Sequence, residues 1–323
     1  MEKSEVHNVT DLTAFFLVGF QGSQYLRILL FSLLFVTFCG TICGNLLIIF
    51  LVSTSKILHT PMYFFISQLS ISDILLTLDI VPNLLYIIFN DGGFITFIDC
   101  MIQCYFFLTV ESSQCFLLTA MSYDRYVAIL NPLRYNSIMT STRCVTLVII
   151  FWLLGAFFVL TYIAPLSRLK FCGRNIIDHV FCDILPLLEL SCSDTFPIKL
   201  QIYFLSFPIV IIPCIIIVIS YVKIVQAILR IPSNISRRKA FSTCSSHLIV
   251  VSIFYWTIFS VYVLSKNKNL PDMNKILPLL YTVFTPLVNP IIYSFRNKDM
   301  KKAMEEVWLC GLSRTDACPD LGL

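Results

Sequence analysis

The chain has 323 residues, of which 57% are hydrophobic and 13% are charged, and its formal net charge is +4. Soluble domains usually carry about 25% charged residues, so half that value excludes an ordinary water-soluble protein and indicates a chain that lies in lipid. The small, dispersed positive charge excludes nucleic acid as a partner. We predict an all-α membrane protein.

Seven segments are long and apolar enough to cross a membrane, which takes about 20 helical residues. Five of them contain a charge-free window of that length, and single acids interrupt the second (Asp73, Asp79) and the third (Glu111). The predicted spans are 26–54, 60–88, 97–130, 144–166, 198–228, 238–264 and 273–295. They form one seven-helix transmembrane domain over 26–295, with an amino-terminal arm over 1–25 and a tail over 296–323.

The distribution of basic residues predicts the orientation of the bundle. With the amino terminus outside, 14 of the 23 Lys and Arg residues lie in cytoplasmic segments and the other nine lie in outer segments. This bias follows the positive-inside rule. The triplet Asn8-Val9-Thr10 is a glycosylation acceptor that would then face the secretory lumen. We therefore expect an extracellular arm and a cytoplasmic tail.

The last span and the tail have distinctive local signals. Pro286 and Pro290 each remove a backbone hydrogen bond, so they predict a kinked helix, and Pro213 predicts a similar bend in the fifth span. Asn289 could bond a freed carbonyl or a neighbouring helix. The following run, RNKDMKKAMEEVW, predicts a short amphipathic helix on the inner membrane surface.

Polar residues in the third span share one helix face. At 100° per residue, Gln114, Glu111 and Phe107 fall within about 40° of Arg125, and Glu111 lies about 21 Å outward from it. Asp73, midway along the second span, can face the same space. Intramembrane acids are functional candidates because their burial is costly. The alternative is a buried polar patch that only orders helix packing.

The loop after the fourth span contains HVFCD, where His179, Cys182 and Asp183 could bind a soft metal. The alternative, which we favour, is that Cys182 is oxidised and His179 only sits on the loop. Of the 13 cysteines, four lie in outer segments, where an oxidising compartment allows disulfides. They permit three pairings, and they are Cys100, Cys172, Cys182 and Cys192.

Several blocks of the chain match one family pattern. They are GN (Gly44, Asn45), LHTPMYFF (Leu58–Phe65), LSISD (Leu69–Asp73), MSYDRYVAI (Met121–Ile129), SY (Ser220, Tyr221), KAFSTCSSHL (Lys239–Leu248) and PLVNPIIYSFRNK (Pro286–Lys298). Together they resemble the olfactory receptors, a family of rhodopsin-like G-protein-coupled receptors. The LHTPMYFF and KAFSTCSSH blocks are specific to olfactory receptors, whereas DRY and NPxxY mark rhodopsin-like receptors generally.

The resemblance implies a multi-pass plasma-membrane receptor that binds a small-molecule odorant, couples to a stimulatory olfactory-type G protein and raises cyclic AMP, with no cofactor. It implies disulfides Cys100–Cys182 and Cys172–Cys192. It also implies an odorant cavity in the outer halves of the third, fifth, sixth and seventh spans, lined by mostly apolar residues. On matching positions these residues are Phe107, Leu108, Glu111, Ser112, Ser206, Ile209, Tyr255, Ile258, Phe259, Tyr262 and Thr282.

Three departures from the family pattern stand out. The family usually has an acid at the position of Gln114, whereas here the acid stands one turn earlier, at Glu111. A sodium site on Asp73 and Gln114 is therefore in doubt, and Glu111 becomes a cavity carboxylate. The usual FYG reads FYW, which places Trp256 beside Tyr255, and the usual Cys after DRYVAI is Leu130.

The adjacent charges Asp124 and Arg125 end the third span. Arg125 could simply snorkel to lipid phosphates. The resemblance favours a switch, in which Arg125 is held by Asp124 at rest and lines a G-protein cleft once the sixth span moves outward. The resemblance places five further residues in this coupling region, namely Tyr126, Tyr221, Asn289, Pro290 and Tyr293.

Other classes of seven-helix or membrane protein fit less well. A retinal protein needs a lysine in its last span, and Ile276–Phe295 contains none. A transporter is expected to show internal repeats, and a hydrolase a nucleophile with a base, so we expect no enzyme. The closest alternative is a non-olfactory rhodopsin-like receptor for an amine or lipid mediator, which the short third inner loop and the two olfactory blocks disfavour.

Overall fold

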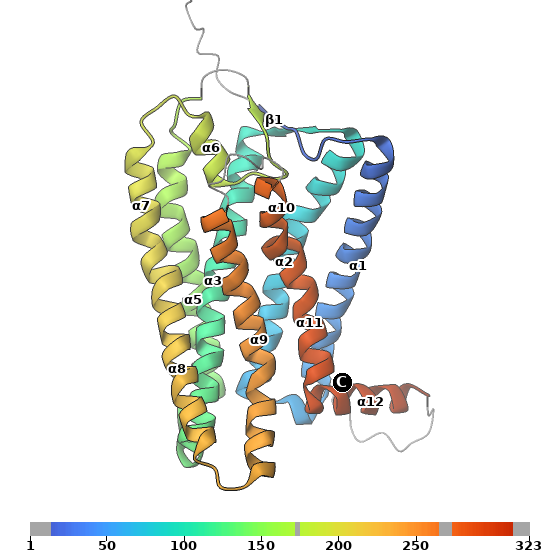
Figure 1. Ribbon diagram of the computed structural model, residues 1–323, viewed down its shortest axis with the longest axis vertical. Helices are drawn as coiled ribbons and strands as arrows, with labels where there is room; N and C mark the ends of the chain where they lie inside the picture. Colours follow the sequence, from blue (N-terminus) through green and yellow to red (C-terminus); the bar gives the residue numbers. More distant parts are fainter. Residues whose placement is uncertain (1–13, 172–174, 265–272, 313–323) are drawn as a thin grey trace, which may run out of the picture.

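The computed structural model describes residues 14–171, 175–264 and 273–312. Long helices run side by side and span the length of the molecule (Figure 1). Five of the seven membrane-crossing segments are single helices, whereas the fifth and the seventh are each divided by a π-helical turn. In chain order the segments are α1 (Gln24–Thr54), α2 (Pro61–Asn90), α3 (Phe97–Leu130), α5 (Ser141–Leu166), α7 (Phe196–Ser206) with η3 (Phe207–Ile211) and α8 (Ile212–Leu229), α9 (Asn234–Leu264), and α10 (Met273–Leu279) with η4 (Leu280–Phe284) and α11 (Thr285–Arg296).

Short elements connect these segments at both ends of the bundle. The inner connections contain η1 (Lys56–Leu58), η2 (Pro132–Arg134) and α4 (Tyr135–Ile138), and the loop after α5 contains α6 (Ile184–Leu190). The last described element, α12 (Lys298–Leu312), follows α11 and projects sideways from the bundle near its inner end (Figure 1). Met300 and Ala303 of α12 are fully buried, whereas its Lys and Glu residues are exposed, as the amphipathic pattern predicts.

The prediction of seven spans is confirmed. Six of the described helical segments are apolar enough to cross a membrane by composition alone, and α3 is the seventh. It is the least apolar because it is central: it contacts α2, α5, α8 and α9. Polar side chains such as Gln103, Ser113 and Gln114 of α3 are therefore buried against protein rather than lipid.

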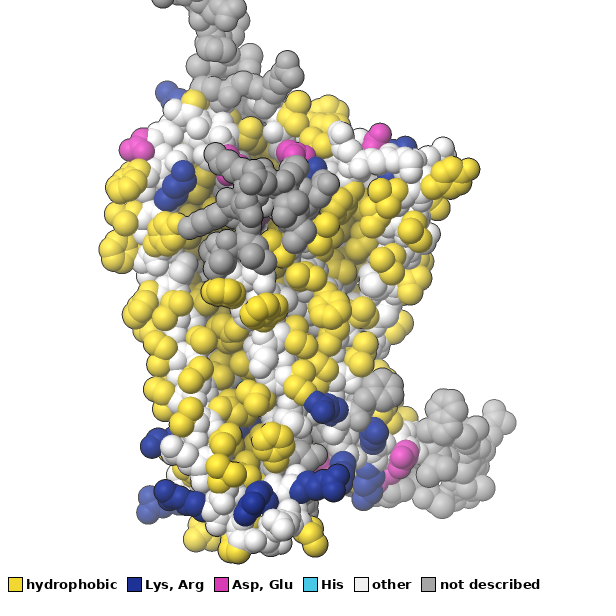
Figure 2. Space-filling view, in the orientation of Figure 1, with side chains coloured by type: hydrophobic (Ala, Val, Ile, Leu, Met, Phe, Trp, Pro, Cys, Tyr) yellow, Lys and Arg dark blue, Asp and Glu magenta, His cyan; other side chains and the backbone are white. Residues whose placement is uncertain are grey.

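The outer surface of the bundle has the properties of a lipid-facing wall. Large apolar side chains such as Leu33, Phe157 and Phe204 are more than half exposed. Figure 2 shows apolar side chains over the middle of the molecule, with Lys and Arg side chains gathered at the end that carries α12. This end therefore carries the charge expected of a cytoplasmic face.

Prolines shape the fifth and seventh segments through π turns. The turn η3 ends just before Ile212-Pro213, and η4 ends just before Thr285-Pro286. A proline clashes with the carbonyl four residues earlier, and a wider turn removes that clash. The Thr285 hydroxyl donates to the Leu280 carbonyl at 3.0 Å and so satisfies an acceptor in the widened turn. The predicted bends at Pro213 and Pro286 therefore take the form of π turns.

The carbonyl that Pro290 deprives of its helical donor is that of Pro286. The Asn45 side-chain amide donates to this carbonyl at 3.0 Å and to Thr41 O at 2.9 Å. Gly44, beside Asn45, allows the close approach of α1 and α11, because a Cβ there would lie 3.1 Å from the Pro290 ring. The Gly-Asn pair of α1 thus compensates for a proline in α11.

A small sheet covers part of the outer end, which the all-helical prediction did not include. Its strands β2 (Gly93–Thr96), β1 (Ala14–Leu17) and β3 (Ile176–Ile177) lie in that order, with β1 antiparallel to β2 and parallel to β3. These runs are too short to show an alternating pattern in the sequence.

The disulfide Cys100–Cys182 ties the loop after α5 to the start of α3. This is the first of the two bridges that the family resemblance implies. Cys172, expected to pair with Cys192, lies outside the described residues, as does the glycosylation acceptor Asn8. These two expectations therefore stay predictions.

Candidate functional site: an outer cavity and an inner cleft

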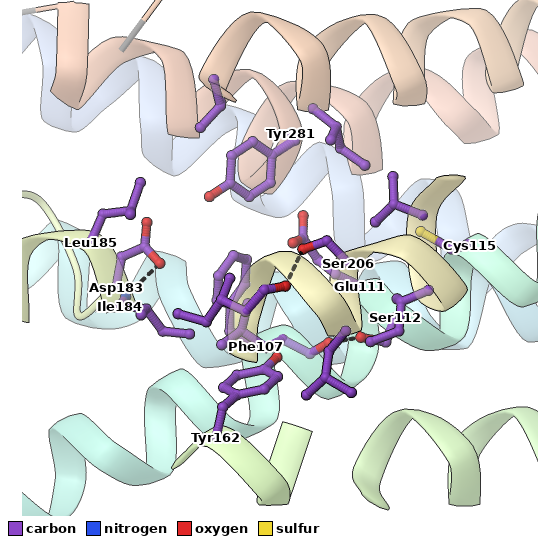
Figure 3. A pocket seen from close by; sticks show the side chains of 17 residues that line it. Phe107, Glu111, Ser112, Cys115, Tyr162, Asp183, Ile184, Leu185, Ser206 and Tyr281 are labelled. Atoms are coloured by element: carbon purple, nitrogen blue, oxygen red, sulfur yellow. Dashed lines mark hydrogen bonds between the residues drawn. The ribbon is translucent and has the colours of Figure 1, made fainter. Parts of the chain in front are cut away.

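A cavity of about 110 Å³ lies in the outer half of the bundle, between α3, the fifth segment, α9 and the seventh segment, with the loop around α6 on its outer side (Figure 3). Most of its lining is apolar or aromatic. The lining residues are Phe107, Leu108, Glu111, Ser112, Cys115, Tyr162, Asp183, Ile184, Leu185, Ile202, Leu205, Ser206, Ile209, Val210, Ile258, Val261 and Tyr281.

Seven of the eleven residues predicted for the odorant cavity line this space, namely Phe107, Leu108, Glu111, Ser112, Ser206, Ile209 and Ile258. Three others do not. Phe259 is 56% exposed on the lipid-facing side, and Tyr255 packs against the inner core cluster of the bundle. Thr282 is fully buried and donates to Pro278 O at 2.9 Å. The side chain of Tyr262 lies outside the described residues.

Local geometry explains why these three residues do not line the cavity. On α9, Ile258 and Val261 face the cavity, and Phe259 lies about 100° away from Ile258 around the helix, so it points toward lipid. Tyr255 is on the cavity side but one turn deeper. In the seventh segment both Tyr281 and Thr282 lie in the π turn η4 and are buried, but Tyr281 lines the cavity where Thr282 was expected.

Two of the lining residues, Phe107 and Tyr281, belong to a chain of aromatic contacts. The Phe107 ring is stacked on Tyr281 at a centroid distance of 5.7 Å and meets the edge of Phe181 at 5.5 Å. Phe181 in turn packs edge to face against His179 at 5.0 Å. Phe107 and Tyr281 line the cavity, whereas Phe181 and His179 of the outer loop pack behind Phe107 and support its ring.

Two carboxylates are the charged side chains of the lining. Figure 3 shows Glu111 and Asp183 on opposite sides of the Tyr281 ring. The Asp183 carboxylate accepts a hydrogen bond from its neighbour Ile184 N at 2.7 Å. Burial raises the pKa of the Asp183 carboxyl, and the nearby His179 opposes that shift. Among the described residues, Glu111 has no hydrogen bond or ion pair.

The HVFCD segment is built into the outer end of the cavity. The Cys182 sulfur is in the disulfide with Cys100, so its thiolate is not free to bind a metal. His179 is buried, and its Nδ1 lies 3.0 Å from the Phe181 carbonyl oxygen. Burial lowers the pKa of this imidazole, while Asp183 opposes the shift. We infer a packing role for His179, with Asp183 facing the cavity.

Lys275 fastens the outer loops to the seventh segment. Its side chain is 6% exposed, and its ammonium forms an ion pair with Asp178 and donates to Gly19 O at 2.9 Å. Asp178 follows strand β3, and Gly19 lies two residues after β1. The outer sheet is therefore held to α10 by one buried cation.

The middle of the bundle contains a closed polar cluster. The fully buried Asp73 carboxylate accepts from the Gln114 amide at 2.8 Å and from the Asn289 amide at 2.9 Å. Each carboxylate oxygen therefore has an amide donor from a different helix. Asn289 bonds a neighbouring helix rather than a carbonyl freed by proline, which was the other possibility that the sequence left open.

At the inner end of α3 the DRY residues are engaged with each other and with the second inner loop. Arg125 donates to Asp124 Oδ2 at 2.6 Å and 3.0 Å, and the Tyr135 hydroxyl donates to Asp124 Oδ1 at 2.8 Å. Asp124 is fully buried. Burial raises the pKa of Tyr135, and the Asp124 carboxylate raises it further. The expected pairing of Arg125 with Asp124 is present.

A cleft of about 950 Å³ opens beside this pair at the inner end. Arg125, His247 and Tyr293 are among the residues that line it. The Tyr221 hydroxyl and His247 Nδ1 share a hydrogen bond of 2.5 Å. Tyr126 stacks on Tyr123 at a centroid distance of 6.3 Å. Of the seven predicted coupling residues, Arg125 and Tyr293 line this cleft, Tyr221 contacts its lining residue His247, and Asn289 lies deeper, in the Asp73 cluster.

Some lining residues were not found from the sequence. Tyr281 lies in the π turn η4, where Pro286 predicted only a bend, and Tyr162 comes from α5, where no polar position marked an inward face. Asp183 was considered only as a weak metal ligand. Its place in the cavity could have been inferred from Cys182, because the bridge to Cys100 brings the loop over the outer end of α3.

Comparisons with known proteins show the family to which the chain belongs. A family model described as olfactory receptor matches residues 31–310. The chain is 45% identical to olfactory receptor 11L1 of Homo sapiens over 313 residues, which cover 95% of this chain and 96% of that protein. It is 42% identical to the olfactory receptor-like protein I9 of Rattus norvegicus over 300 residues, with 93% and 96% covered.

A further human relative, olfactory receptor 6B1, is 42% identical over 312 residues, which cover 97% of this chain and all of that protein. Matches over nearly the whole chain show that it has the seven-helix fold of this family, which is a family of receptors and not of enzymes. The chain belongs to the olfactory receptor family: it is a multi-pass plasma-membrane G-protein-coupled receptor that senses an odorant and acts through a G protein.

Proposed function

We propose that the odorant is a small, mostly apolar molecule that binds in the outer cavity between α3, η3, α9 and η4. The observation that carries this proposal is the lining itself, in which aliphatic and aromatic side chains surround a few polar groups. Ligand pockets commonly have this composition. The volume of about 110 Å³ is of the same order as an engineered cavity of about 150 Å³ that binds benzene.

The position of the cavity supports coupling to the inner end. Phe107 and Glu111 lie on the same helix as Arg125, and Ile258 and Tyr281 belong to segments that also reach the inner cleft. A ligand that binds one packing of these helices better than the other would shift the population toward it. In the proposed active state α9 moves outward and Arg125 leaves Asp124.

At the inner end, we propose that the receptor activates a stimulatory G protein of the olfactory type and raises cyclic AMP. The large cleft beside Arg125 supports this, because it contains basic side chains such as Arg238 and Arg296. We also propose that α12 contacts membrane lipid, with its buried Met300 side facing the bundle and basic residues available to lipid phosphates.

A cyclic-AMP reporter in cells that carry surface-labelled receptor tests the proposal. Six-carbon and eight-carbon odorants that differ in one functional group form the panel, and cells without receptor are the control. We expect a concentration-dependent rise in cyclic AMP that requires both the receptor and the stimulatory G protein. The proposal is wrong if surface expression is proven and no compound changes cyclic AMP.

A further inference from the structure

We propose that the cavity is selective for a small aliphatic amine, whose protonated nitrogen pairs with Glu111. This inference rests on the proposed function of the cavity and adds the chemical class of its ligand. It follows from three properties of the site: the sign of its charges, the lack of a hydrogen-bond or ion-pair partner for Glu111 among the described residues, and the space around Glu111.

The charged side chains that line the cavity within the described residues are both acidic. Glu111 projects from α3 and Asp183 from the outer loop, and the lining contains no Lys, Arg or His from those residues. Two carboxylates in an apolar space create a negative potential that attracts a cation and repels an anion. An acid ligand would therefore be disfavoured, and a cationic ligand would be attracted.

Glu111 differs from the other polar groups of the cavity because the described chain supplies no partner for it. The Ser112 hydroxyl donates to Leu108 O at 2.7 Å, and the Ser206 hydroxyl donates to Ile202 O at 2.8 Å. Both hydroxyl protons are therefore used within their own helices. An ionised carboxylate that faces apolar side chains is costly without a counterion, and an ammonium group would provide one.

Asp183 has polar partners within the protein, whereas Glu111 has none among the described residues. It accepts a hydrogen bond from Ile184 N and has the imidazole of His179 near it. We therefore assign the direct ion pair to Glu111, with Asp183 adding to the field from the other side of the cavity. The Asp73 cluster shows the contrast, because there two amide donors already occupy the carboxylate.

The space beside Glu111 accommodates an unbranched or slightly branched alkyl chain. Leu205, Ile209 and Ile258 supply aliphatic surface from two helices, and Phe107 supplies an aromatic face. Such a lining stabilises the apolar part of an amine by removing it from water. The ligand is thus an amine with one compact hydrocarbon group.

A neutral Glu111 would recognise a different class. A protonated carboxyl donates a hydrogen bond, so it would bind an alcohol or an aldehyde, and a glutamine amide could replace it. Comparison of Glu111→Gln with Glu111→Asp separates the two cases, because only the aspartate keeps the charge.

The experiment measures cyclic-AMP responses of surface-normalised receptor to hexylamine, hexan-1-ol, hexanal and hexanoic acid, which share one chain length. We expect hexylamine to be the most potent and hexanoic acid the least. Glu111→Gln should raise the half-maximal concentration of hexylamine at least tenfold, about 1.4 kcal/mol, without the same loss for hexan-1-ol. Glu111→Asp should retain most of the hexylamine response.

Glu189→Gln is the matched control. Glu189 is an exposed acid in the outer loop that contains Asp183, and it does not line the cavity. It should leave the hexylamine response unchanged. The amine assignment is overturned if hexanol or hexanal is more potent than hexylamine, or if Glu111→Gln leaves hexylamine potency intact; the odorant cavity then still stands. If none of the four probes produced a cyclic-AMP response, the cavity proposal would be overturned as well.

Discussion

The two ends of α3 hold their charges in opposite ways. At the inner end Asp124 accepts hydrogen bonds from Arg125 and Tyr135, so the chain satisfies its own charge. In the outer half Glu111 faces the cavity with no partner among the described residues. The two sites are about 21 Å apart along one helix. A charge satisfied within the chain suits a resting state that can exchange partners, whereas a charge without a partner suits an external ligand.

The segment between these two sites is filled by buried polar contacts. Asp73 receives amide donors from Gln114 of α3 and Asn289 of α11. Displacement of α3 relative to α11 would therefore have to break or rearrange these hydrogen bonds. The cluster joins α3 to α11 between the outer and inner sites, and the predictions below perturb one end at a time.

The largest expected effect comes from the output end. Arg125→Ala removes the cation that Asp124 holds at rest and that we assign to the G-protein cleft. Cyclic-AMP responses should fall to the level of cells without receptor, while surface expression and odorant binding persist. Lys302→Ala removes an exposed cation on α12, 64% accessible, and should keep the response. Normal signalling by Arg125→Ala would remove Arg125 from the output mechanism.

An intermediate effect is expected at the outer end. Lys275→Met removes the cation that holds Asp178 and the Gly19 carbonyl to α10, and a lost buried hydrogen bond costs about 1–3 kcal/mol. The purified receptor should unfold several degrees lower, with weaker odorant potency but normal maximal cyclic AMP. Asp178→Asn should cost less, because Asp178 is 63% exposed. Equal unfolding temperatures for Lys275→Met and wild type would show that Lys275 does not fasten the outer sheet.

The smallest effect is expected at Tyr135. Tyr135→Phe removes the hydroxyl that donates to Asp124 at 2.8 Å but keeps the ring. A loss of about 1 kcal/mol from the resting state corresponds to a roughly fivefold larger active population. Basal cyclic AMP should rise accordingly, and odorant potency should rise by no more than the same factor. Tyr123→Phe, on an exposed ring, serves as control, and unchanged basal activity would show that Tyr135 does not stabilise the resting state.

The sequence predicted the parts of the fold that follow from hydrophobic length and helical periodicity. The seven spans follow from the need to bury each backbone polar group in lipid within a helix. Because α3 is a regular helix, stepping at 100° per residue correctly grouped Phe107 and Glu111 on the cavity face. The kinks in the fifth and seventh segments were expected from their prolines.

Features that depend on tertiary contacts were not predicted. In the seventh segment Tyr281 rather than Thr282 lines the cavity. Pro286 predicted a bend there but not a π turn, whose extra residue changes the angular positions of nearby side chains around the helix. The outer sheet forms because β1 pairs with β2 and β3, which lie far from it in the sequence. Phe259 was placed in the cavity by family position, although its place on α9 turns it toward lipid.

Recruitment of a stimulatory G protein to the surface-expressed receptor, measured as hexylamine is added, tests most directly whether Glu111 is the input and Arg125 the output. The account predicts recruitment by wild type, a shift to at least tenfold higher hexylamine concentration in Glu111→Gln, and none at any concentration in Arg125→Ala although hexylamine still binds. Recruitment that is the same in wild type and in either variant would contradict the account.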